Sequence, residues 1–198
     1  MMKNGLEVDM RDEESEKMCP SVFATREASE NAHVLDKKDR TVTIWSDPKR
    51  HNDVVNLEDF TILKLLGKGN FGKVVLAMKN KTEKLFAMKI LSKKSIIEQN
   101  QLEHTKSEHL ILQHVNHPFL VSLNSAFQSK HKLYFVMELM RGGELYCLLG
   151  KARSFTEEQT KFFVACVILG LGHLHANNFV YRDLKLENVL LDDKGFAK

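Results

Sequence analysis

The apolar positions after residue 57 fall into short segments that predict a series of β-strands. Residues 60–66 predict a half-buried strand that leads into a glycine-rich segment, residues 67–72. Four further strands are predicted at residues 73–78, 85–91, 119–127 and 133–139. Polar residues at 80–82 and 129–132 have the composition of turns and separate neighbouring strands. The first half of the domain is therefore expected to be rich in strands.

Helical patterns lie between and after these strands. A polar stretch from about Gln99 to His114 predicts a helix, and Pro118 prevents its continuation. Thr156 and Gln159 have the spacing of a capping box and open a long helix that extends to about His175. This helix is apolar on much of its circumference, so we expect it to be buried. Strands first and helices later predict an α+β protein with two lobes and no internal repeats.

Residues 1–56 differ from the remainder in being polar and charged throughout. One short alternating patch, Thr41–Trp45, interrupts them. The patch could be a strand that packs on the domain or a segment that binds a partner, whereas the rest has the composition of a loosely ordered extension. All these interpretations stay open at this stage.

Composition and charge narrow the class of protein only slightly. Apolar residues make up 43% of the chain and charged residues 28%, which is enough to bury a core. The formal net charge of +3 hides an asymmetry, because residues 1–58 carry −4 and the remaining residues +7. A basic body attracts polyanions such as nucleotide phosphates. Nucleic acid is not expected as a partner, because no basic stripe with interspersed aromatic residues is present.

Cysteine and histidine spacing predicts neither disulfides nor a metal centre. The three cysteines are odd in number and far apart, which indicates a reducing compartment. His173 and His175 lie two residues apart and match no zinc motif. The longest apolar run, residues 162–172, is much shorter than the ~20 residues that span a bilayer, and the acidic N-terminus does not resemble a signal peptide. We expect a soluble protein of the cytoplasm, with the nucleus as an alternative.

The glycine-rich segment has the spacing Gly67, Gly69, Gly72. This spacing alone is weak evidence, since dinucleotide-binding folds and chance both produce it. A dinucleotide site would place a helix after the glycines, whereas residues 73–78 predict a strand. A glycine loop between two strands is typical of protein kinases, in which it covers the nucleotide phosphates. A plain hairpin turn that needs glycine for positive φ is the alternative.

Lys89 and Glu108 are candidates for a buried ion pair. Lys89 lies within an apolar strand, where burying an ammonium group is costly without an anion. Glu108 follows on the predicted helix, where no lysine or arginine occupies the positions three or four residues away. A distant cation is therefore its natural partner. The alternatives are a lysine on the solvent face of the strand and a solvated glutamate.

Residues 181–188, Tyr-Arg-Asp-Leu-Lys-Leu-Glu-Asn, carry the groups that phosphoryl transfer requires. Asp183 can accept the proton of an attacking hydroxyl, and Lys185 can stabilise the γ-phosphate. Asn188 can supply an oxygen ligand for Mg²⁺. An exposed polar loop is the alternative, but the preceding motifs occur in the order that a phosphoryl-transfer site needs.

With these motifs the chain resembles the eukaryotic protein kinases from about Phe60 to Lys198. Within them it is most similar to the AGC group, because Tyr181 precedes Arg-Asp. Leu186 in place of proline, together with residues 195–198, favours a resemblance to protein kinase C and the cyclic-nucleotide-dependent kinases within this group. Lys185 is typical of serine/threonine kinases. The resemblance implies a monomeric enzyme that transfers the γ-phosphate of ATP, with Mg²⁺, to Ser or Thr of protein substrates.

The resemblance also implies a division of the chain and a set of site residues. Residues 1–56 would be an extension, 57–139 the small lobe and 140–198 the first part of the large lobe. ATP-binding roles are implied for Leu66, Gly67, Lys68, Gly69, Asn70, Phe71, Gly72, Lys73, Val74, Ala87, Lys89, Glu108, Met137, Glu138, Met140 and Glu144. Met137 would be the gatekeeper, and the backbone of Glu138 and Met140 would hydrogen-bond adenine.

Two acidic residues receive a substrate role from the same resemblance. Glu144 and Glu187 would bind arginines that precede the phosphoacceptor, so we expect substrates with basic residues there. The alternative for Glu144 is an ordinary glutamate stabilised by a helix N-terminus.

In protein kinases an Asp-Phe-Gly segment follows a few residues after the position of Lys198, at which this sequence ends. That aspartate is the main magnesium ligand, and further helices follow it. On this basis we expect the chain as printed to be a poor catalyst whose long helix exposes apolar surface. Three interpretations stay open: an active kinase whose record is truncated, a module that binds ATP or a partner, and a non-functional gene fragment.

Overall fold

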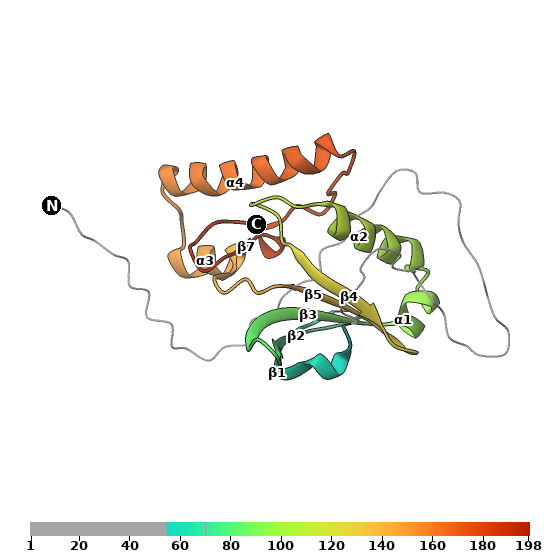
Figure 1. Ribbon diagram of the computed structural model, residues 1–198. Coiled ribbons are helices and arrows are strands. Elements are labelled where there is room, and N and C mark those ends of the chain that lie inside the picture. The colour runs from blue at the N-terminus through green and yellow to red at the C-terminus, as the bar shows by residue number, and fades with distance from the viewer. Residues whose placement is uncertain (1–54, 70) are drawn as a thin grey trace.

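A five-stranded antiparallel sheet forms the first half of the protein in the computed structural model, which describes residues 55–69 and 71–198 (Figure 1). The strands are β1 (Phe60–Lys68), β2 (Gly72–Lys79), β3 (Lys84–Ser92), β4 (Leu123–Gln128) and β5 (Lys132–Glu138), in the order β1-β2-β3-β5-β4. A short 3-10 helix, η1 (Leu57–Asp59), precedes β1. The five predicted strands are confirmed, although β4 begins four residues later than the pattern indicated.

Two helices connect β3 to β4, where the sequence predicted one. α1 (Lys93–Glu98) was missed, although Ser92 marks its start by accepting a hydrogen bond from the Ser95 backbone N–H at 3.3 Å. α2 (Leu102–His114) is the predicted helix. It begins later than expected because Asn100 adopts φ +55°, a left-handed conformation that ends α1.

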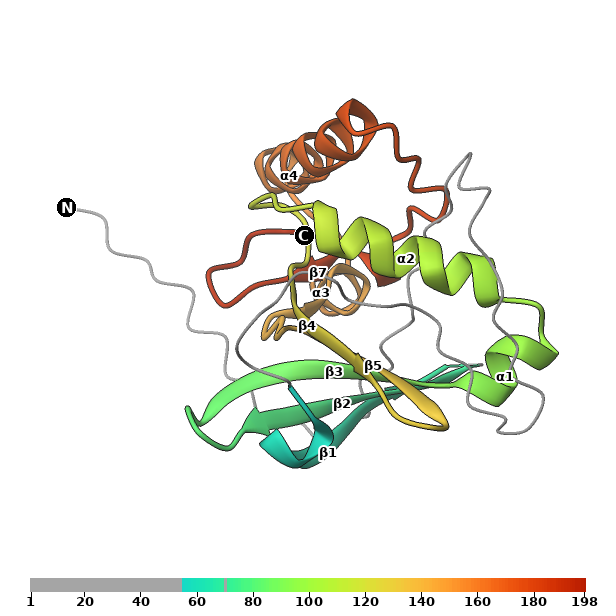
Figure 2. The same ribbon diagram turned by 45° about the vertical axis from the view of Figure 1, so that its right-hand side comes forward.

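The remaining elements make up a helical part, residues 143–198. They are β6 (Gly143–Glu144), α3 (Leu145–Ala152), α4 (Glu157–Ala176), the 3-10 helix η2 (Leu186–Asn188) and β7 (Leu190–Leu191). β6 and β7 pair as a small antiparallel sheet. The predicted capping box is confirmed, because Thr156 and Gln159 exchange side-chain-to-backbone hydrogen bonds at the start of α4. Figures 1 and 2 show the large sheet and α4 on opposite sides, with α2 and β7 between them.

Three apolar clusters hold these layers together. One covers a face of the sheet around Met88 and Val136, and a second packs α1 and α2 on the other face through Ile96 and Phe135. The third joins α3, α4 and β7 around Cys166. The buried members of the third cluster all come from residues 143–198, and Phe119 packs against them from outside this part.

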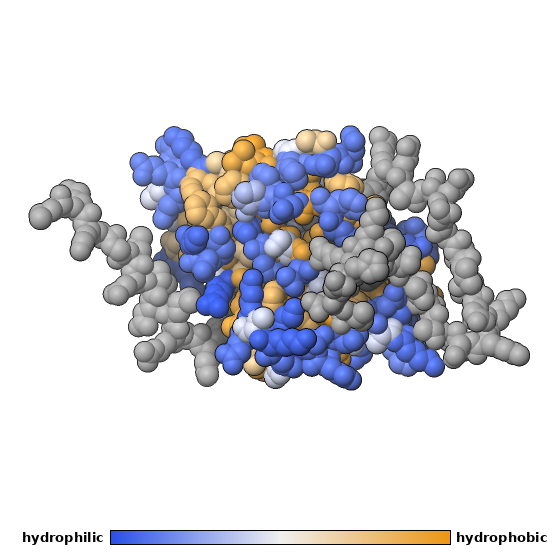
Figure 3. Space-filling view, in the orientation of Figure 1, coloured by the Kyte–Doolittle hydropathy of each residue, from blue (hydrophilic) through white to orange (hydrophobic). Residues whose placement is uncertain are grey.

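The predicted burial of α4 is correct for one side of the helix only. Cys166, Gly170 and Leu174 are buried, and a Cβ at Gly170 would lie 2.7 Å from the Phe119 carbonyl oxygen, so α4 packs closely there. Four other apolar residues of the helix are 43–61% exposed: Phe162, Val164, Ile168 and Leu169. Figure 3 shows hydrophobic residues on the surface in the region of α4. The sequence pattern reports apolarity around the helix but not which neighbours cover it.

Some expectations fall outside the described residues. The patch Thr41–Trp45, most of the predicted extension 1–56 and Asn70 of the glycine loop are among them. The division of the chain at residues 56 and 139 stays a prediction. Within the described residues, no helix combines the length and hydropathy that a membrane crossing requires.

Candidate active site

The glycine-rich loop connects β1 to β2, as the strand–loop–strand pattern predicted. The Gly69 N–H donates to the Gly72 carbonyl oxygen at 2.9 Å and narrows the loop. A Cβ on Gly72 would overlap the Ile90 carbonyl oxygen of β3, so glycine is required there for close strand approach. Because a strand and not a helix follows the glycines, the dinucleotide-binding arrangement is wrong for this chain.

Several predicted residues of this loop do not line the central cavity described below. Lys68 of β1 and Lys73 of β2 are opposite each other in the strand register, and both are exposed. Phe71 packs against the apolar cluster beneath α1, and its carbonyl oxygen accepts the Ser92 N–H at 2.9 Å. Gly67, Gly69 and Gly72 likewise lie outside the cavity lining. The ATP roles of these residues therefore stay predictions.

Lys89 and Glu108 form the predicted buried ion pair. Lys89 comes from the middle of β3 and Glu108 from α2, and the distance from Nζ to Oε1 is 2.6 Å. The two side chains are 9% and 11% exposed, which excludes both the solvent-facing lysine and the solvated glutamate. Truncating one member of such a pair strands a buried charge, at a cost of about 3–5 kcal/mol. The pair therefore fixes α2 against the sheet.

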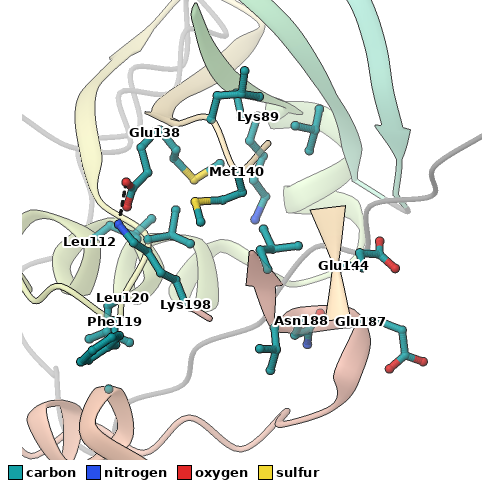
Figure 4. Close-up of a pocket in the computed structure, with 18 of the residues that line it drawn as sticks. Lys89, Leu112, Phe119, Leu120, Glu138, Met140, Glu144, Glu187, Asn188 and Lys198 are labelled. Atoms are coloured by element: carbon teal, nitrogen blue, oxygen red, sulfur yellow. Dashed lines mark hydrogen bonds and ion pairs between the residues drawn. The ribbon is translucent and has the colours of Figure 1, made fainter. Parts of the chain in front are cut away.

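A cavity of about 500 Å³ opens beside this pair, between the sheet, α2 and the helical part (Figure 4). Many predicted ligand residues line it: Leu66, Val74, Ala87, Lys89, Glu108, Met137, Glu138, Met140, Glu144, Glu187 and Asn188. They come from β1, β2, β3, α2, β5, β6 and η2, which are far apart in the sequence. The volume lies in the range of small-molecule sites.

The walls of the cavity are mainly aliphatic. Val74 and Leu76 are neighbours on one face of β2, opposite Lys89 and Ala87 of β3. Met137 of β5 pairs with Ala87 from the other side. Sequence reasoning missed Leu76, although its two-residue spacing from Val74 was a signal for the same face. Such a slot suits a flat apolar ring, and the nearby lysine supplies charge at one side.

Leu190 is a second lining residue that sequence reasoning missed. It belongs to β7 and follows two residues after Asn188, the last residue of η2. The available signal in the sequence was the run of three apolar residues at 189–191, which is typical of a short strand. The helical part therefore contributes an apolar residue to the cavity as well as polar ones.

Asp183, Lys185 and Asn188 are brought together by the loop before β7. Lys185 Nζ lies 3.1 Å from Asp183 Oδ2. The Asn188 Nδ2 group donates to the Asp183 carbonyl oxygen at 2.9 Å and to its Oδ2 at 2.8 Å. Arg182 adopts φ +61°, which turns the backbone sharply before the aspartate. The Asp183 side chain is 34% exposed and is thus held in place while open to solvent.

Asn188 has one acceptor atom that can bind a cation. Its Nδ2 group is occupied by Asp183, but its Oδ1 is buried with no hydrogen-bond partner in the described structure. A buried acceptor without a partner costs free energy unless a ligand satisfies it. An amide oxygen fits a hard divalent cation such as Mg²⁺. No group of three His, Cys, Asp or Glu side chains suited to a metal occurs in the described part of the chain, so other oxygens would have to complete the coordination.

Tyr181 is a further residue of the site whose structural role sequence reasoning missed. It lines the cavity. Burial and the negative charge of Asp183 raise the pKa of Tyr181 to about 12, although a hydrogen bond with Asn188 acts in the opposite direction. The phenol therefore stays protonated at neutral pH. Its place directly before Arg182 and Asp183 in the sequence was the available signal.

Glu144 and Glu187 lie on the same side of the cavity (Figure 4). Glu144 is only 6% exposed and directly precedes α3, and its side chain does not form the capping hydrogen bond of an N-cap residue. The alternative for Glu144, stabilisation by the positive end of the α3 dipole, needs no such hydrogen bond and stays open beside the substrate role. Cys147 Sγ lies 4.0 Å from Glu144 Oε2, and Glu187 is half-buried in η2. The two acidic residues give this end of the cavity a negative character.

Comparison with known proteins decides the family. The family model described as "Protein kinase domain" matches residues 60–198. The chain belongs to the protein kinase family. It is 49% identical over 148 residues to the RAC family serine/threonine-protein kinase homolog of Dictyostelium discoideum. The aligned residues cover 75% of this chain and 33% of that protein. It is 48% identical over 144 residues to the human RAC-beta serine/threonine-protein kinase, covering 73% and 30%.

These relatives confirm the predicted resemblance to the AGC group and the α+β kinase fold. A Drosophila melanogaster protein named RAC serine/threonine-protein kinase is 50% identical over 144 residues, which cover 73% of this chain and 24% of that protein. The finer leaning toward protein kinase C stays a prediction. The chain spans a third or less of the length of these curated relatives. Kinases of this family generally use ATP and Mg²⁺.

Proposed function

We propose that the cavity binds ATP together with Mg²⁺ and that the protein transfers the γ-phosphate to Ser or Thr of protein substrates. The observation that carries this proposal is the buried Lys89–Glu108 pair at the wall of the cavity. A lysine held by a carboxylate offers a fixed positive charge to phosphate oxygens without first having to be ordered. A purely structural ion pair would not need a cavity of about 500 Å³ beside it.

The aliphatic walls support adenine as the base. Val74, Ala87 and Leu190 would enclose a flat ring, and Met137 lies next to Ala87 on the neighbouring strand. The backbone at residues 138–140 would provide the polar contacts, because a main-chain edge offers both donors and acceptors. In this arrangement the base lies against the sheet and the phosphates extend toward Lys89.

The loop around Asp183 supports the transfer step. Asp183 would accept the proton of the substrate hydroxyl, while Lys185, 3.1 Å away, would offset negative charge on the phosphoryl group. Mg²⁺ would supply positive charge that neutralises the phosphate oxygens. Asn188 would hold it through the Oδ1 atom that has no other partner in the described structure.

The preference for substrates with basic residues rests on Glu144 and Glu187. A carboxylate that is mostly buried gains more from an arginine than a solvated one does, because water screens it less. The peptide would therefore approach from the side of β6. We further propose that the protein works as a monomer in the cytoplasm, with the nucleus as an alternative, and takes no nucleic acid as a partner.

A second candidate function, nucleotide binding without transfer, is favoured by one observation. The described residues hold no carboxylate cluster near Asn188 that could complete a metal site. A chain with this arrangement could retain nucleotide and contribute only to binding a partner protein. Two separate assays distinguish the two candidates.

Nucleotide binding is tested by the change in Tm of the 198-residue chain with ATP and Mg²⁺. We expect wild type to be stabilised, Lys89→Met to lose most of the shift, and Lys81→Met, an exposed lysine in the β2–β3 turn, to retain it. Transfer is tested with radiolabelled ATP and a Ser/Thr peptide rich in arginine, with Asp183→Asn as the variant that must lose signal. A shift without transfer would leave the second candidate, and the absence of any shift would refute both.

A further inference from the structure

The side chain of Glu138, at the end of β5, is held from two sides. Its Oε1 accepts the Ser122 backbone N–H at 2.8 Å, and its Oε2 pairs with Lys198 Nζ at 2.8 Å (Figure 4). The Glu138 N–H also donates to the Ser122 carbonyl oxygen at 3.1 Å. One residue thus connects the segment before β4, the end of β5 and the end of the described helical part.

Lys198 is itself fixed by its backbone. Its N–H donates to the Leu190 carbonyl oxygen at 2.8 Å, and its carbonyl oxygen accepts the Leu190 N–H at 2.9 Å. Its side chain is 14% exposed and that of Glu138 is 29% exposed, so the pair is sheltered from solvent. Water screens such a partly sheltered pair less than it screens a surface pair.

Both members of the pair line the cavity. Residues 138–140 all line the cavity, and we refer to them as the edge segment. Of the groups described, Lys198 is the cation that joins this segment to the helical part. Movement of Lys198 would therefore be transmitted through Glu138 to the position of the edge segment.

We propose that Lys198 is a positioning residue that, through Glu138, fixes the edge segment and thereby sets the preference for an adenine over a guanine base. The inference rests on the proposed function of the cavity as a nucleotide site. Adenine and guanine present different donors and acceptors at the edge that meets a backbone. A backbone held in one place rejects the wrong pattern, because mismatched polar groups are left buried and unpaired. A mobile backbone can adjust to either base.

The test compares Lys198→Met, which removes the cation, with Lys198→Arg, which retains it. Lys194→Met is the matched control, because Lys194 is an exposed lysine of the same hairpin. Affinities for ATP and GTP are measured by calorimetry on the full 198-residue chain. We expect Lys198→Met to weaken ATP by about fivefold and GTP by less than twofold, which narrows the preference for ATP. Lys198→Arg should restore at least half of the loss, and Lys194→Met should match wild type.

A second measurement needs no nucleotide. Amide hydrogen exchange of residues 138–140 should become faster in Lys198→Met and in Glu138→Gln, and should stay unchanged in Lys194→Met. A general loss of stability would instead accelerate exchange across the whole sheet and weaken both nucleotides equally. That pattern, or unchanged exchange in the edge segment, would overturn the positioning role.

The outcomes also separate this inference from the proposed function. If the wild-type chain binds ATP but transfers no phosphate, its kinase activity is refuted, whereas its preference for ATP over GTP can still be measured. Wild type that binds neither nucleotide overturns both the ATP site and the base preference. Equal weakening of ATP and GTP with faster local exchange would also overturn the base preference.

Discussion

Replacing Glu108 by glutamine would leave the Lys89 ammonium buried beside a neutral amide. The two side chains are 9% and 11% exposed and lie 2.6 Å apart, so water can solvate neither group well. Removing the charge of one partner from such a pair costs about 3–5 kcal/mol. For a domain of this size each kcal/mol lowers Tm by about 2–4 °C, so the expected decrease is about 6–20 °C.

The matched control is an exposed pair on the same helix. Lys106 and Glu103 lie 3.1 Å apart, but Glu103 is 67% exposed, so Glu103→Gln should change stability by about 1 kcal/mol or less. Thermal unfolding at pH 7 would be followed by far-UV circular dichroism for both variants. A double variant, Lys89→Met with Glu108→Leu, should recover part of the lost stability, because no charge is then left buried.

Two results would refute this reasoning. One is a Glu108→Gln protein whose Tm is no lower than that of Glu103→Gln, which would mean that water reaches Lys89. The other is a double variant as unstable as the single one, since the loss would then come from packing and not from an unpaired charge. Either result would also weaken the view of Lys89 as a preorganised phosphate ligand.

The remaining predictions concern two glycines and one histidine. Gly72→Ala should destabilise the fold by about 1–3 kcal/mol, because its Cβ would overlap the backbone of β3. Gly150→Ala lies in α3 with free space around it and should stabilise the fold by about 0.5–1 kcal/mol. Urea unfolding measures both changes. Burial and the neighbouring His173, stacked at 4.8 Å, lower the pKa of His117, so the unfolded chain binds this proton more tightly. The contribution of neutral His117 to the free energy of unfolding is therefore complete above pH ~6.5. It is lost as the pH falls through the lower pKa that His117 has in the folded state. His117→Asn should flatten the fall in stability between pH 7 and 5, and His175→Asn should not; equal slopes would contradict this.

The motifs with local geometry could be predicted from the sequence. The glycine loop needs only two strands and a turn, and residues 183–188 bring their own partners together within one loop. The Lys89–Glu108 pair could also be predicted, because the lack of a local partner for Glu108 required a distant cation. In each of these cases the chemistry of a single segment limited the alternatives strongly.

Contacts between distant segments could not be predicted in the same way. Lys198 and Glu138 are 60 residues apart, and nothing in the pattern around either one requires the other. α1 was missed because a six-residue helix has too few turns to establish a period, and only its cap at Ser92 marks it. Periodicity alone predicted a buried α4, whereas the expectation that α4 exposes apolar surface came from the kinase resemblance and is confirmed by the exposed Phe162, Val164, Ile168 and Leu169.

The position of the cavity explains why nucleotide should affect stability as well as catalysis. Its lining comes from both the sheet and the helical part, and contacts such as Lys198 with Glu138, and Gly170 against Phe119 in the segment before β4, join the two. A ligand that touches both parts binds the joined arrangement and not the separated one. It therefore stabilises the fold by RT ln(1 + [L]/Kd), or about 2.7 kcal/mol at a hundredfold excess over Kd. Lys198→Met, which loosens the junction and weakens ATP binding, should accordingly gain less stability than wild type at the same ATP concentration.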